Sequence, residues 1–422
     1  MRISGVMGML CVCGLAASAV AAPLTPGNLV VMKVGSMGTG SGEVVLSEYS
    51  KAGTALGNDI VIPFAGPNAI SIPQITNHDR HIHRSVDGRL ISFVGYNAAP
   101  DATDPSSLTA ASTPRVVGLL DFHGNVDLST KLNANYNATS IRGAATTDGS
   151  QIWTGGDNAS GATPTGGTLY MTRGATLVNN ISKVQTLGLT KTPDNIRDVG
   201  VYSGQLYNCS GSNSSVGKAT FQVGIGLPTV GNQSLTTLNT DGASTSSFIM
   251  LDLDPSVPGP DVMYTAATVP TDCSHKYVKS GGVWVLKGQI DLPGIDQITA
   301  EANVDGGVTV YIASTSTVSV YHDPAPLTGS ITGLTLTSII TPDTGYTLGG
   351  IALSTQFCVG DLNNDGLVDD ADFVLFANAY NLLMCDDPTM PYPCPADFNS
   401  DGMVDDSDFV LFVNGYDALL CP

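Results

Sequence analysis

Short runs of hydrophobic residues, each followed by a tight turn and a second run, recur along most of this chain. Arg84–Tyr96 and Ile141–Trp153 each place an Asp-Gly turn between two apolar runs. Ile196–Tyr207 and Ile298–Ala313 repeat the arrangement with other glycine-containing turns. Two apolar runs joined by such a turn are typical of a β-hairpin. The pattern therefore predicts a mainly β fold.

The hairpins that begin near residues 84, 141 and 196 are spaced by fifty-odd residues. A repeat of that length holds four short strands, which is the size of one β-propeller blade. The region from 22 to 355 would then contain about six blades, with seven as the alternative count. A β-sandwich or a β-helix also uses strands of this length, so the hairpins alone leave those folds open.

The two ends of this region predict how a propeller would close. Strand-like runs at 28–34 and 43–49 lack a preceding inner hairpin, and another such run follows at 349–353. Pairing the last run with the first would complete one blade from both ends of the region. It would also remove the free sheet edges.

Composition favours strands and restricts the partners. Charged residues make up only 13% of the chain, which contains 48 glycines. Acidic residues outnumber basic ones by 37 to 17, so we do not expect nucleic acid as a partner. Thirteen Asp residues lie between residues 358 and 422, a segment without Lys, Arg or Glu. A bound cation would offset the repulsion between these carboxylates.

Residues 1–21 are predicted to be a signal peptide. Arg2 supplies a positive start, 6–17 is a short apolar run, and Ala19-Val20-Ala21 fits a cleavage site. The alternative is a membrane anchor, but the apolar run is shorter than the ~20 residues that a spanning helix needs. We therefore expect a secreted or cell-surface-associated protein that does not span a membrane.

The segment from residue 361 to residue 408 contains two copies of one Asp-rich motif. Each copy has oxygen-bearing side chains at positions 1, 3, 5, 9 and 12, a glycine at 6 and a main-chain carbonyl at 7, which is the pattern of a calcium loop. The ligands would be Asp361, Asn363, Asp365, Leu367, Asp369 and Asp372 in the first copy, and Asp397, Asn399, Asp401, Met403, Asp405 and Asp408 in the second. Because these ligands are all hard oxygens, they favour Ca²⁺ over softer metals. We expect two calcium ions.

The two motifs belong to a longer duplication. Over the 25 residues from Asp361 to Cys385, 16 are identical to those from Asp397 to Cys421. After each loop, apolar residues recur at a spacing that places them on one helical face. They are Phe373, Phe376, Tyr380 and Leu383, then Phe409, Phe412, Tyr416 and Leu419. A solvated acidic tail would not carry this spacing, so residues 358–422 are predicted to form a small all-α domain.

These repeats resemble type I dockerin modules. Each repeat has a loop and an exiting helix but no room for an entering helix, and position 12 is Asp where an ordinary EF-hand prefers Glu. The flanking cysteines resemble a variant seen in exported bacterial proteins. The resemblance implies two antiparallel helices related by a near-twofold axis, two calcium ions, and docking to a cohesin or similar receptor.

Two loop positions depart from the dockerin pattern. Positions 10 and 11 help set the choice of partner in dockerins and are often Ser or Thr, whereas here they are Asp370-Ala371 and Asp406-Ser407. Because these positions help set partner choice, the receptor could differ from the cohesins that typical dockerins bind. Before the repeats, a segment that includes Phe248–Asp252 and Gly259–Tyr264 resembles one blade of uncharacterised secreted bacterial β-propeller-like proteins.

Six cysteines remain after the signal peptide, and an even number in an exported protein predicts disulfides. Cys209 and Cys273 each follow the second strand of a predicted inner hairpin, so we expect them to pair.

The other four cysteines flank the two repeats. A helix from Asp370 to Leu383 would be ~20 Å long, which strains a pairing of Cys358 with Cys385 because disulfide Cα atoms lie within ~7 Å. With the antiparallel helices that the resemblance implies, Cys385 would pair with Cys394, and Cys358 with Cys421.

Two weaker candidate sites lie in the predicted propeller. His81 and His83 would point to the same face of a strand, so together with His78 they could form a metal or ligand site, or a polar strand end. Carboxylates near predicted inner strands could supply the acidic pair that a glycosidase needs, although turns and caps explain most of them equally well. These carboxylates are Asp79, Asp148, Asp198, Asp252, Asp261 and Glu301.

The sequence therefore predicts a secreted calcium-binding protein in which a dockerin-type module anchors a propeller to a cohesin-like receptor or cell-surface scaffold. The propeller would bind or display a carbohydrate or other extracellular ligand. The alternative is a dockerin-borne glycoside hydrolase or lyase of polysaccharide catabolism, and a purely structural surface protein is a third reading. Close carboxylates beside exposed aromatics in the central pocket would favour hydrolysis, and their absence would favour binding.

Overall fold

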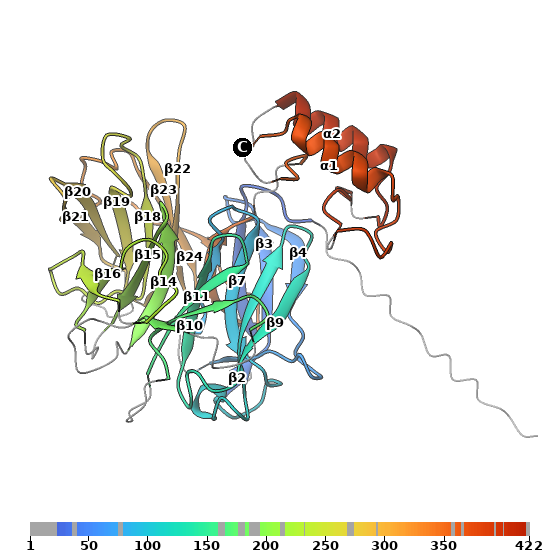
Figure 1. Ribbon diagram of the computed structural model, residues 1–422. Coiled ribbons are helices and arrows are strands. Elements are labelled where there is room, and N and C mark those ends of the chain that lie inside the picture. The colour runs from blue at the N-terminus through green and yellow to red at the C-terminus, as the bar shows by residue number, and fades with distance from the viewer. Residues whose placement is uncertain are drawn as a thin grey trace, which may run out of the picture.

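Among the residues that the structure describes, six four-stranded antiparallel sheets are followed in the chain by two helices (Figure 1). The computed structural model describes residues 23–35, 40–74, 79–158, 165–175, 182–184, 195–211, 216–231, 233–267, 274–292, 294–355, 359–363, 367–391, 394–399 and 401–418. The sheets are the blades of a six-bladed β-propeller. The predicted mainly β fold is confirmed, with six blades rather than seven, and the sandwich and β-helix alternatives are excluded.

Five blades are each built from four strands that follow one another in the sequence. Blade 1 contains β6 (Ile82–Arg84), β7 (Leu90–Tyr96), β8 (Arg115–Asp121) and β9 (Val126–Leu132). Blade 2 contains β10 (Ile141–Thr146), β11 (Gln151–Gly156), β12 (Thr168–Thr172) and β13 (Ser182–Val184). Blade 3 contains β14 (Ile196–Tyr202), β15 (Gln205–Ser210), β16 (Ala219–Val223) and β17 (Leu235–Thr237). Blade 4 contains β18 (Ser247–Leu251), β19 (Val262–Ala266), β20 (Ser274–Ser280) and β21 (Val283–Ile290), and blade 5 contains β22 (Ile295–Ala302), β23 (Val308–Ser314), β24 (Val318–Asp323) and β25 (Thr337–Ile340).

The sixth blade joins the two ends of the propeller. Its strand order is β26 (Tyr346–Leu353), β1 (Leu29–Gly35), β3 (Val44–Tyr49) and β4 (Ala55–Val61). Leu29 lies opposite Leu353 on one side and Tyr49 on the other. The predicted closure is therefore confirmed. Outside the blades, β2 (Ser41–Gly42) pairs with β5 (Ile72–Pro73), and a short 3₁₀ helix spans Pro105–Ser107.

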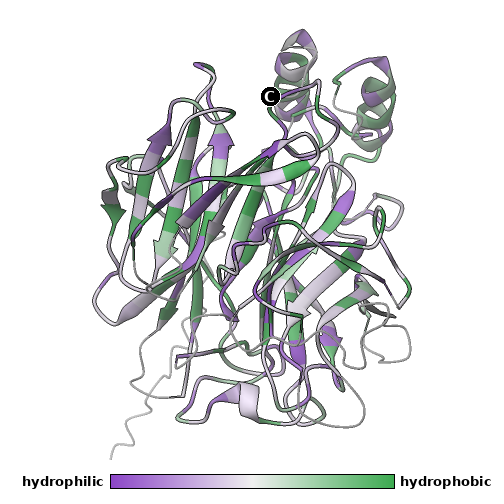
Figure 2. Cartoon of the chain, turned by 90° about the vertical axis from the view of Figure 1, so that its left-hand side faces the viewer, coloured by the Kyte–Doolittle hydropathy of each residue, from purple (hydrophilic) through white to green (hydrophobic). Residues whose placement is uncertain are grey.

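The hydrophobic core lies between neighbouring blades. Val30 of the sixth blade packs in one cluster with Ile82 and Phe93 of blade 1, and Val94 of blade 1 packs in another with Ile141 and Ile152 of blade 2. Figure 2 shows hydrophobic residues along strands throughout the sheets. Since most strands have a neighbouring blade on both faces, the apolar runs of the sequence bury side chains on both sides of each sheet.

The two helices, α1 (Asp370–Tyr380) and α2 (Asp406–Ala418), lie side by side outside the propeller (Figure 1). Tyr380, at the end of α1, donates a hydrogen bond to Asp406 at the start of α2, and Tyr416 donates to Asp370 at the start of α1. These reciprocal bonds require antiparallel helices. Each repeat therefore contacts the other through equivalent residues.

No helix among the described residues is long and apolar enough to cross a membrane. The predicted signal peptide at 1–21 lies outside the described residues, and so do Cys273, Cys358 and Cys421.

Candidate functional site

The first Asp-rich loop closes around the side chain of Asp372, which is fully buried. Its Oδ1 accepts hydrogen bonds from the main-chain N–H groups of Leu362 and Asn363, at 2.7 and 2.9 Å, and its Oδ2 accepts one from Asp369 at 3.0 Å. The N–H of Asp369 and the side chain of Asp372 thus form half of a capping box, which starts α1. Asp365 lies outside the described residues.

The second loop repeats this arrangement around Asp408, which is also fully buried. Asp408 accepts from the N–H groups of Phe398, Asn399 and Asp405, at 2.7, 3.1 and 3.0 Å. The match with the first loop means that both carboxylates at position 12 are held in the same way by their own loops.

Position 1 of the second loop is also enclosed. Asp397 accepts hydrogen bonds from the N–H groups of Asp401 and Gly402, at 3.2 and 2.9 Å. Gly402 has a φ of +87°, the left-handed conformation that glycine adopts most readily, so this position makes the sharp turn that a calcium loop needs. Burial, together with Asp408 and Asp401, raises the pKa of Asp397.

The oxygen atoms of these loops fit a hard divalent cation. Each buried carboxylate uses three of its roughly four lone-pair sites on main-chain N–H groups, which leaves capacity for a further partner. Residues 358–422 contain no Lys, Arg or His, so no basic side chain of this segment can neutralise Asp372 or Asp408. Buried charges need a counter-charge, and the all-oxygen donor set suits Ca²⁺.

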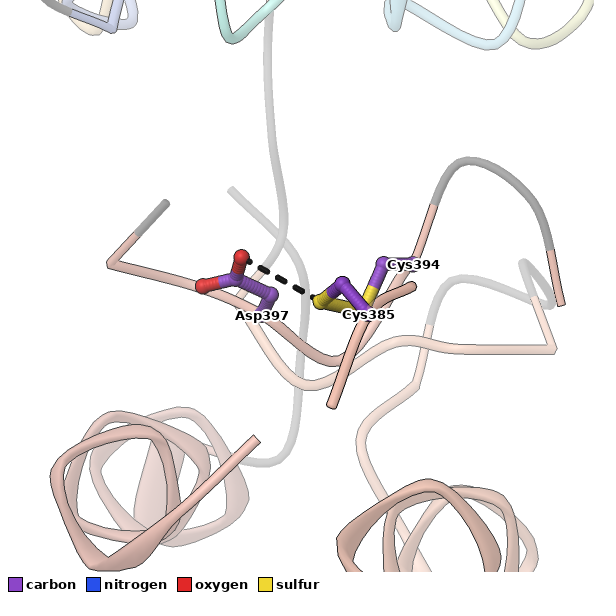
Figure 3. A group of neighbouring side chains, drawn as sticks. All are labelled: Cys385, Cys394 and Asp397. Atoms are coloured by element: carbon purple, nitrogen blue, oxygen red, sulfur yellow. Dashed lines mark hydrogen bonds between the residues drawn. A yellow bond between two sulfur atoms is a disulfide. The ribbon is translucent and has the colours of Figure 1, made fainter. Parts of the chain in front are cut away.

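The connector between the two repeats contains the predicted Cys385–Cys394 disulfide, with Cα atoms 5.5 Å apart. Figure 3 shows this bond beside Asp397, whose Oδ2 lies 3.4 Å from Cys385 Sγ. These three residues are the one compact group of potential metal ligands among the described residues. Because both sulfurs are consumed in the disulfide, they are not thiolate ligands.

A second candidate site is a cavity of about 310 Å³ on the propeller axis. It is lined by residues of all six inner strands, β6, β10, β14, β18, β22 and β26, and of the turns that follow β6, β14 and β18. Its polar lining includes His83, Arg84, Tyr202, Asp252 and Gln297. Most of the remaining lining is apolar, which is usual for a small-molecule pocket.

The other end of the axis is filled with buried charged side chains. At the starts of the inner strands, Arg80, Arg142, Arg197 and Asp296 are all buried. Three of them sit at irregularities in strand pairing, between Ile141 and Gly143, between Ile196 and Asp198, and between Ile295 and Gln297. A bulge re-aims a side chain and is common near functional sites.

The two histidines of the predicted cluster meet a carboxylate there. His83 Nε2 bonds to Asp198 Oδ1 at 2.6 Å, and His81 Nδ1 lies 3.5 Å from the same oxygen. His81 Nε2 lies 3.6 Å from Asp296. Burial lowers the pKa of His81, but Asp198 and Asp296 outweigh that effect and raise it to about 10. The same-face prediction for His81 and His83 is confirmed, and the pair shares a carboxylate, while His78 lies outside the described residues.

The six predicted carboxylates do not form an acidic pair in the cavity. Asp252 is the one acidic residue in its lining, and it accepts a hydrogen bond from Ser203. Glu301 forms an ion pair with Lys51 at 2.6 Å. Asp148 and Asp261 accept hydrogen bonds within turns, and Asp79 and Asp198 are buried in the polar end of the axis.

The predicted pairing of Cys209 with Cys273 is wrong. Cys209 is a buried free thiol. Its side chain packs against Phe248, Met250 and Met263 in the apolar layer between blades 3 and 4. Packing between blades, rather than position at a strand end, decides where this side chain points.

Sequence reasoning missed the residues that connect the inner strands. Gln297 Oε1 accepts hydrogen bonds from the N–H groups of Ile82 and Ile351, and its Nε2 donates to the carbonyl of Ile82. The side chain thus links blades 1, 5 and 6. The sequence contains a pattern that could have indicated this polar layer. Polar residues occur at the same point of three otherwise apolar strands, in Ile141-Arg142-Gly143, Ile196-Arg197-Asp198 and Ile295-Asp296-Gln297.

Comparisons with known proteins identify neither a family nor a function for this chain. No protein-family model and no curated protein matches the sequence. A gluconolactonase from Xanthomonas campestris is similar in structure, with 13% identity and a TM-score of 0.40 over 78% of this chain and 90% of that chain. A xyloglucanase from the same species shows 12% identity and a TM-score of 0.41, over 77% of this chain and 43% of that chain. A dihydro-haem d1 dehydrogenase shows 12% identity and a TM-score of 0.35, over 76% and 56%.

Proposed function

We propose that residues 358–422 are a calcium-binding docking module of dockerin type, which anchors the propeller to a cohesin-like receptor or cell-surface scaffold outside the cell. The observation that carries the proposal is the pair of fully buried carboxylates, Asp372 and Asp408, in a segment without basic residues. The resemblance of the repeats to dockerins supplies the family. The two ions would be held by the twelve loop residues named above.

Exposed apolar side chains on both helices support the docking role. Phe373 and Val374 of α1 are 45% and 58% exposed, and their equivalents in α2, Phe409 and Val410, are 40% and 60% exposed. Large apolar groups left in water at matching positions are typical of a protein-binding surface. Because the positions are duplicated, either helix could meet the receptor.

The departure at loop position 10 has a structural explanation within the module. Asp370 and Asp406 each accept a 2.6 Å hydrogen bond from the tyrosine at the end of the opposite helix. These carboxylates therefore hold the two repeats together. Receptor choice would then depend more on the exposed apolar residues than on position 10.

For the propeller, we propose a binding role rather than polysaccharide hydrolysis. A glycosidase needs two carboxylates about 5–10 Å apart at the bond that it cleaves. The described lining of the cavity contains one carboxylate, that of Asp252. A cavity of 310 Å³ is also at the small end for ligand pockets, which suits a small molecule better than a polymer. The chain leaves the propeller at this mouth, because Leu353 lines the cavity and ends β26.

The docking proposal can be tested with the full mature chain and envelope fractions of the cells that produce it. We expect retention on the envelope in calcium and release by a chelator. Replacing Phe373 and Phe409 together by Ser should abolish retention without affecting calcium binding. Exposed Val283 of the propeller, replaced by Ser, provides the control. Retention that is indifferent to chelator and to both helix substitutions would contradict the docking role.

A further inference from the structure

Arg84 stands apart from the other polar residues around the axial cavity. It is the last residue of β6, and its side chain reaches the cavity at the mouth formed by the ends of the inner strands. Within the described part of the chain its one hydrogen bond is a long one, 3.4 Å from Nη1 to the carbonyl of Ser354. A guanidinium carries five N–H donors, so most of its donors remain available.

Other polar groups of the lining are committed to the protein. Ser203 donates to Asp252, Tyr202 donates to the carbonyl of Phe248, and Thr146 donates to the carbonyl of Gln151. Gln297 is used by the inner strands. His83 is held by Asp198 through its Nε2, so Arg84, with most of its five donors unused, is the lining side chain best placed to recognise an anionic ligand.

The unused donors of Arg84 matter because its guanidinium is partly buried. Loss of water around Arg84 lowers its pKa, and the opposing charge that raises it is Glu301. Glu301 is itself paired with Lys51 at 2.6 Å, so it gives Arg84 only partial compensation. A partly buried cation with few hydrogen bonds is costly, and an anion in the cavity would remove that cost.

The surroundings of Arg84 restrict the anion. Asp252 lines the same cavity and Glu301 lies nearby, so a doubly charged group such as phosphate would meet repulsion. The rest of the lining includes Val201, Phe248, Ile298, Ile351 and Leu353, which suit an apolar body. A single carboxylate matches the planar fork of a guanidinium.

We propose that the axial cavity binds a small monocarboxylate with an apolar body, and that Arg84 binds its carboxylate. The inference rests on the binding role proposed for the propeller, and it names the class of ligand. It does not depend on the calcium-binding module. The cavity volume of 310 Å³ leaves room for a ligand with about one ring, since pockets for drug-sized ligands run to ~1,000 Å³.

The test is a binding titration of the full mature chain with two probes, benzoate and cyclohexanecarboxylate, at millimolar concentrations. Benzamide serves as the neutral counterpart and inorganic phosphate as the doubly charged one. We expect saturable binding of both carboxylates and much weaker binding of benzamide and phosphate. Arg84→Met, which keeps the apolar stem, should weaken carboxylate binding on the order of 10- to 100-fold.

Arg89→Met is the matched control, because Arg89 lies in the next turn, pairs with Asp87 and does not line the cavity. It should leave carboxylate binding unchanged. If Arg84→Met fails to fold, Arg84→Lys keeps the charge without the fork and should weaken binding to an intermediate extent. Absent carboxylate binding, equal binding of benzoate and benzamide, preference for phosphate, or full affinity in the folded Arg84 variants would each overturn the proposal.

The same titrations in calcium and in chelator separate this inference from the docking proposal. We expect identical carboxylate affinities in both. Carboxylate binding without any calcium binding would leave this inference standing and refute the module assignment. Calcium binding without carboxylate binding would overturn this inference and leave the module assignment standing.

Discussion

Replacing Asp198 by Asn should change how the stability of the propeller depends on pH. Asp198 is fully buried and lies within 2.6 Å of His83 and 3.5 Å of His81. Burial alone would raise the pKa of Asp198, but the two histidines outweigh it and lower that pKa well below its usual range. Breaking a buried ion pair by removing one partner costs about 3–5 kcal/mol. We therefore expect Asp198→Asn to lower the free energy of unfolding by an amount of this order near neutral pH.

The pH dependence follows from His81. Its pKa is about 10 in the folded protein against an ordinary value of 6.5, so the protonated imidazole stabilises the fold. That contribution is fully present below pH 6.5 and is lost as the pH rises towards 10. Between pH 6 and pH 9 the contribution of His81 to the free energy of unfolding of the wild type should fall by about 3 kcal/mol. In Asp198→Asn this loss should become smaller, because Asp296 is then the one carboxylate that opposes the effect of burial on His81.

Urea unfolding followed by tryptophan fluorescence measures both effects, since both tryptophans, Trp153 and Trp284, belong to the propeller. Asp148→Asn is the control, because Asp148 is an exposed turn residue of blade 2. The reasoning is refuted if Asp198→Asn matches the control in stability. It is also refuted if the variant and the wild type fall equally in stability from pH 6 to pH 9.

Two further predictions concern the propeller. A Cβ on Gly350 would collide with the carbonyl of Arg80 and the side chain of Gln297, so Gly350→Ala should lower the free energy of unfolding by about 1–3 kcal/mol. For Gly349→Ala the three atoms nearest to the new Cβ all belong to the Arg80 side chain, at 3.0 Å or more, so this change should cost less in the same urea titration. The opposite order of the two losses would contradict the packing described. Burial raises the pKa of the Cys209 thiol, so iodoacetamide should not label Cys209 in the folded protein. It should label Cys209 once the protein is unfolded, even when no reductant is added, and peptide mass spectrometry measures this labelling. A disulfide-linked peptide that contains Cys209 would contradict its free state.

The sequence predicted the parts of the fold that depend on local pattern. Apolar runs around Asp-Gly turns predicted hairpins such as β10–β11, and the unpaired run at 349–353 predicted closure through β26 and β1. The Cys385–Cys394 disulfide followed from helix length and antiparallel packing. The hairpins and the closure need only the strand period, whereas the disulfide also needed the antiparallel packing that the dockerin resemblance implied.

The axial layer could not be predicted in the same way. Whether Asp198 meets His83 depends on bulges, which shift strand register by one residue and change the direction of a side chain. The wrong pairing of Cys209 has a similar cause, since the space between blades 3 and 4 determines its surroundings. Contacts between blades join residues more than a hundred positions apart, such as His83 and Asp198, and no local pattern encodes them.

Calcium titration of the full mature chain by isothermal calorimetry tests the central claim most directly. We expect two ions per chain, and one ion each for Asp372→Asn and Asp408→Asn, because each variant removes the buried carboxylate of one loop. Asp387 is a partly exposed carboxylate of the connector that accepts a hydrogen bond from Thr389, and Asp387→Asn should retain two ions. No calcium binding by the wild type, or unchanged binding by both loop variants, would contradict the account.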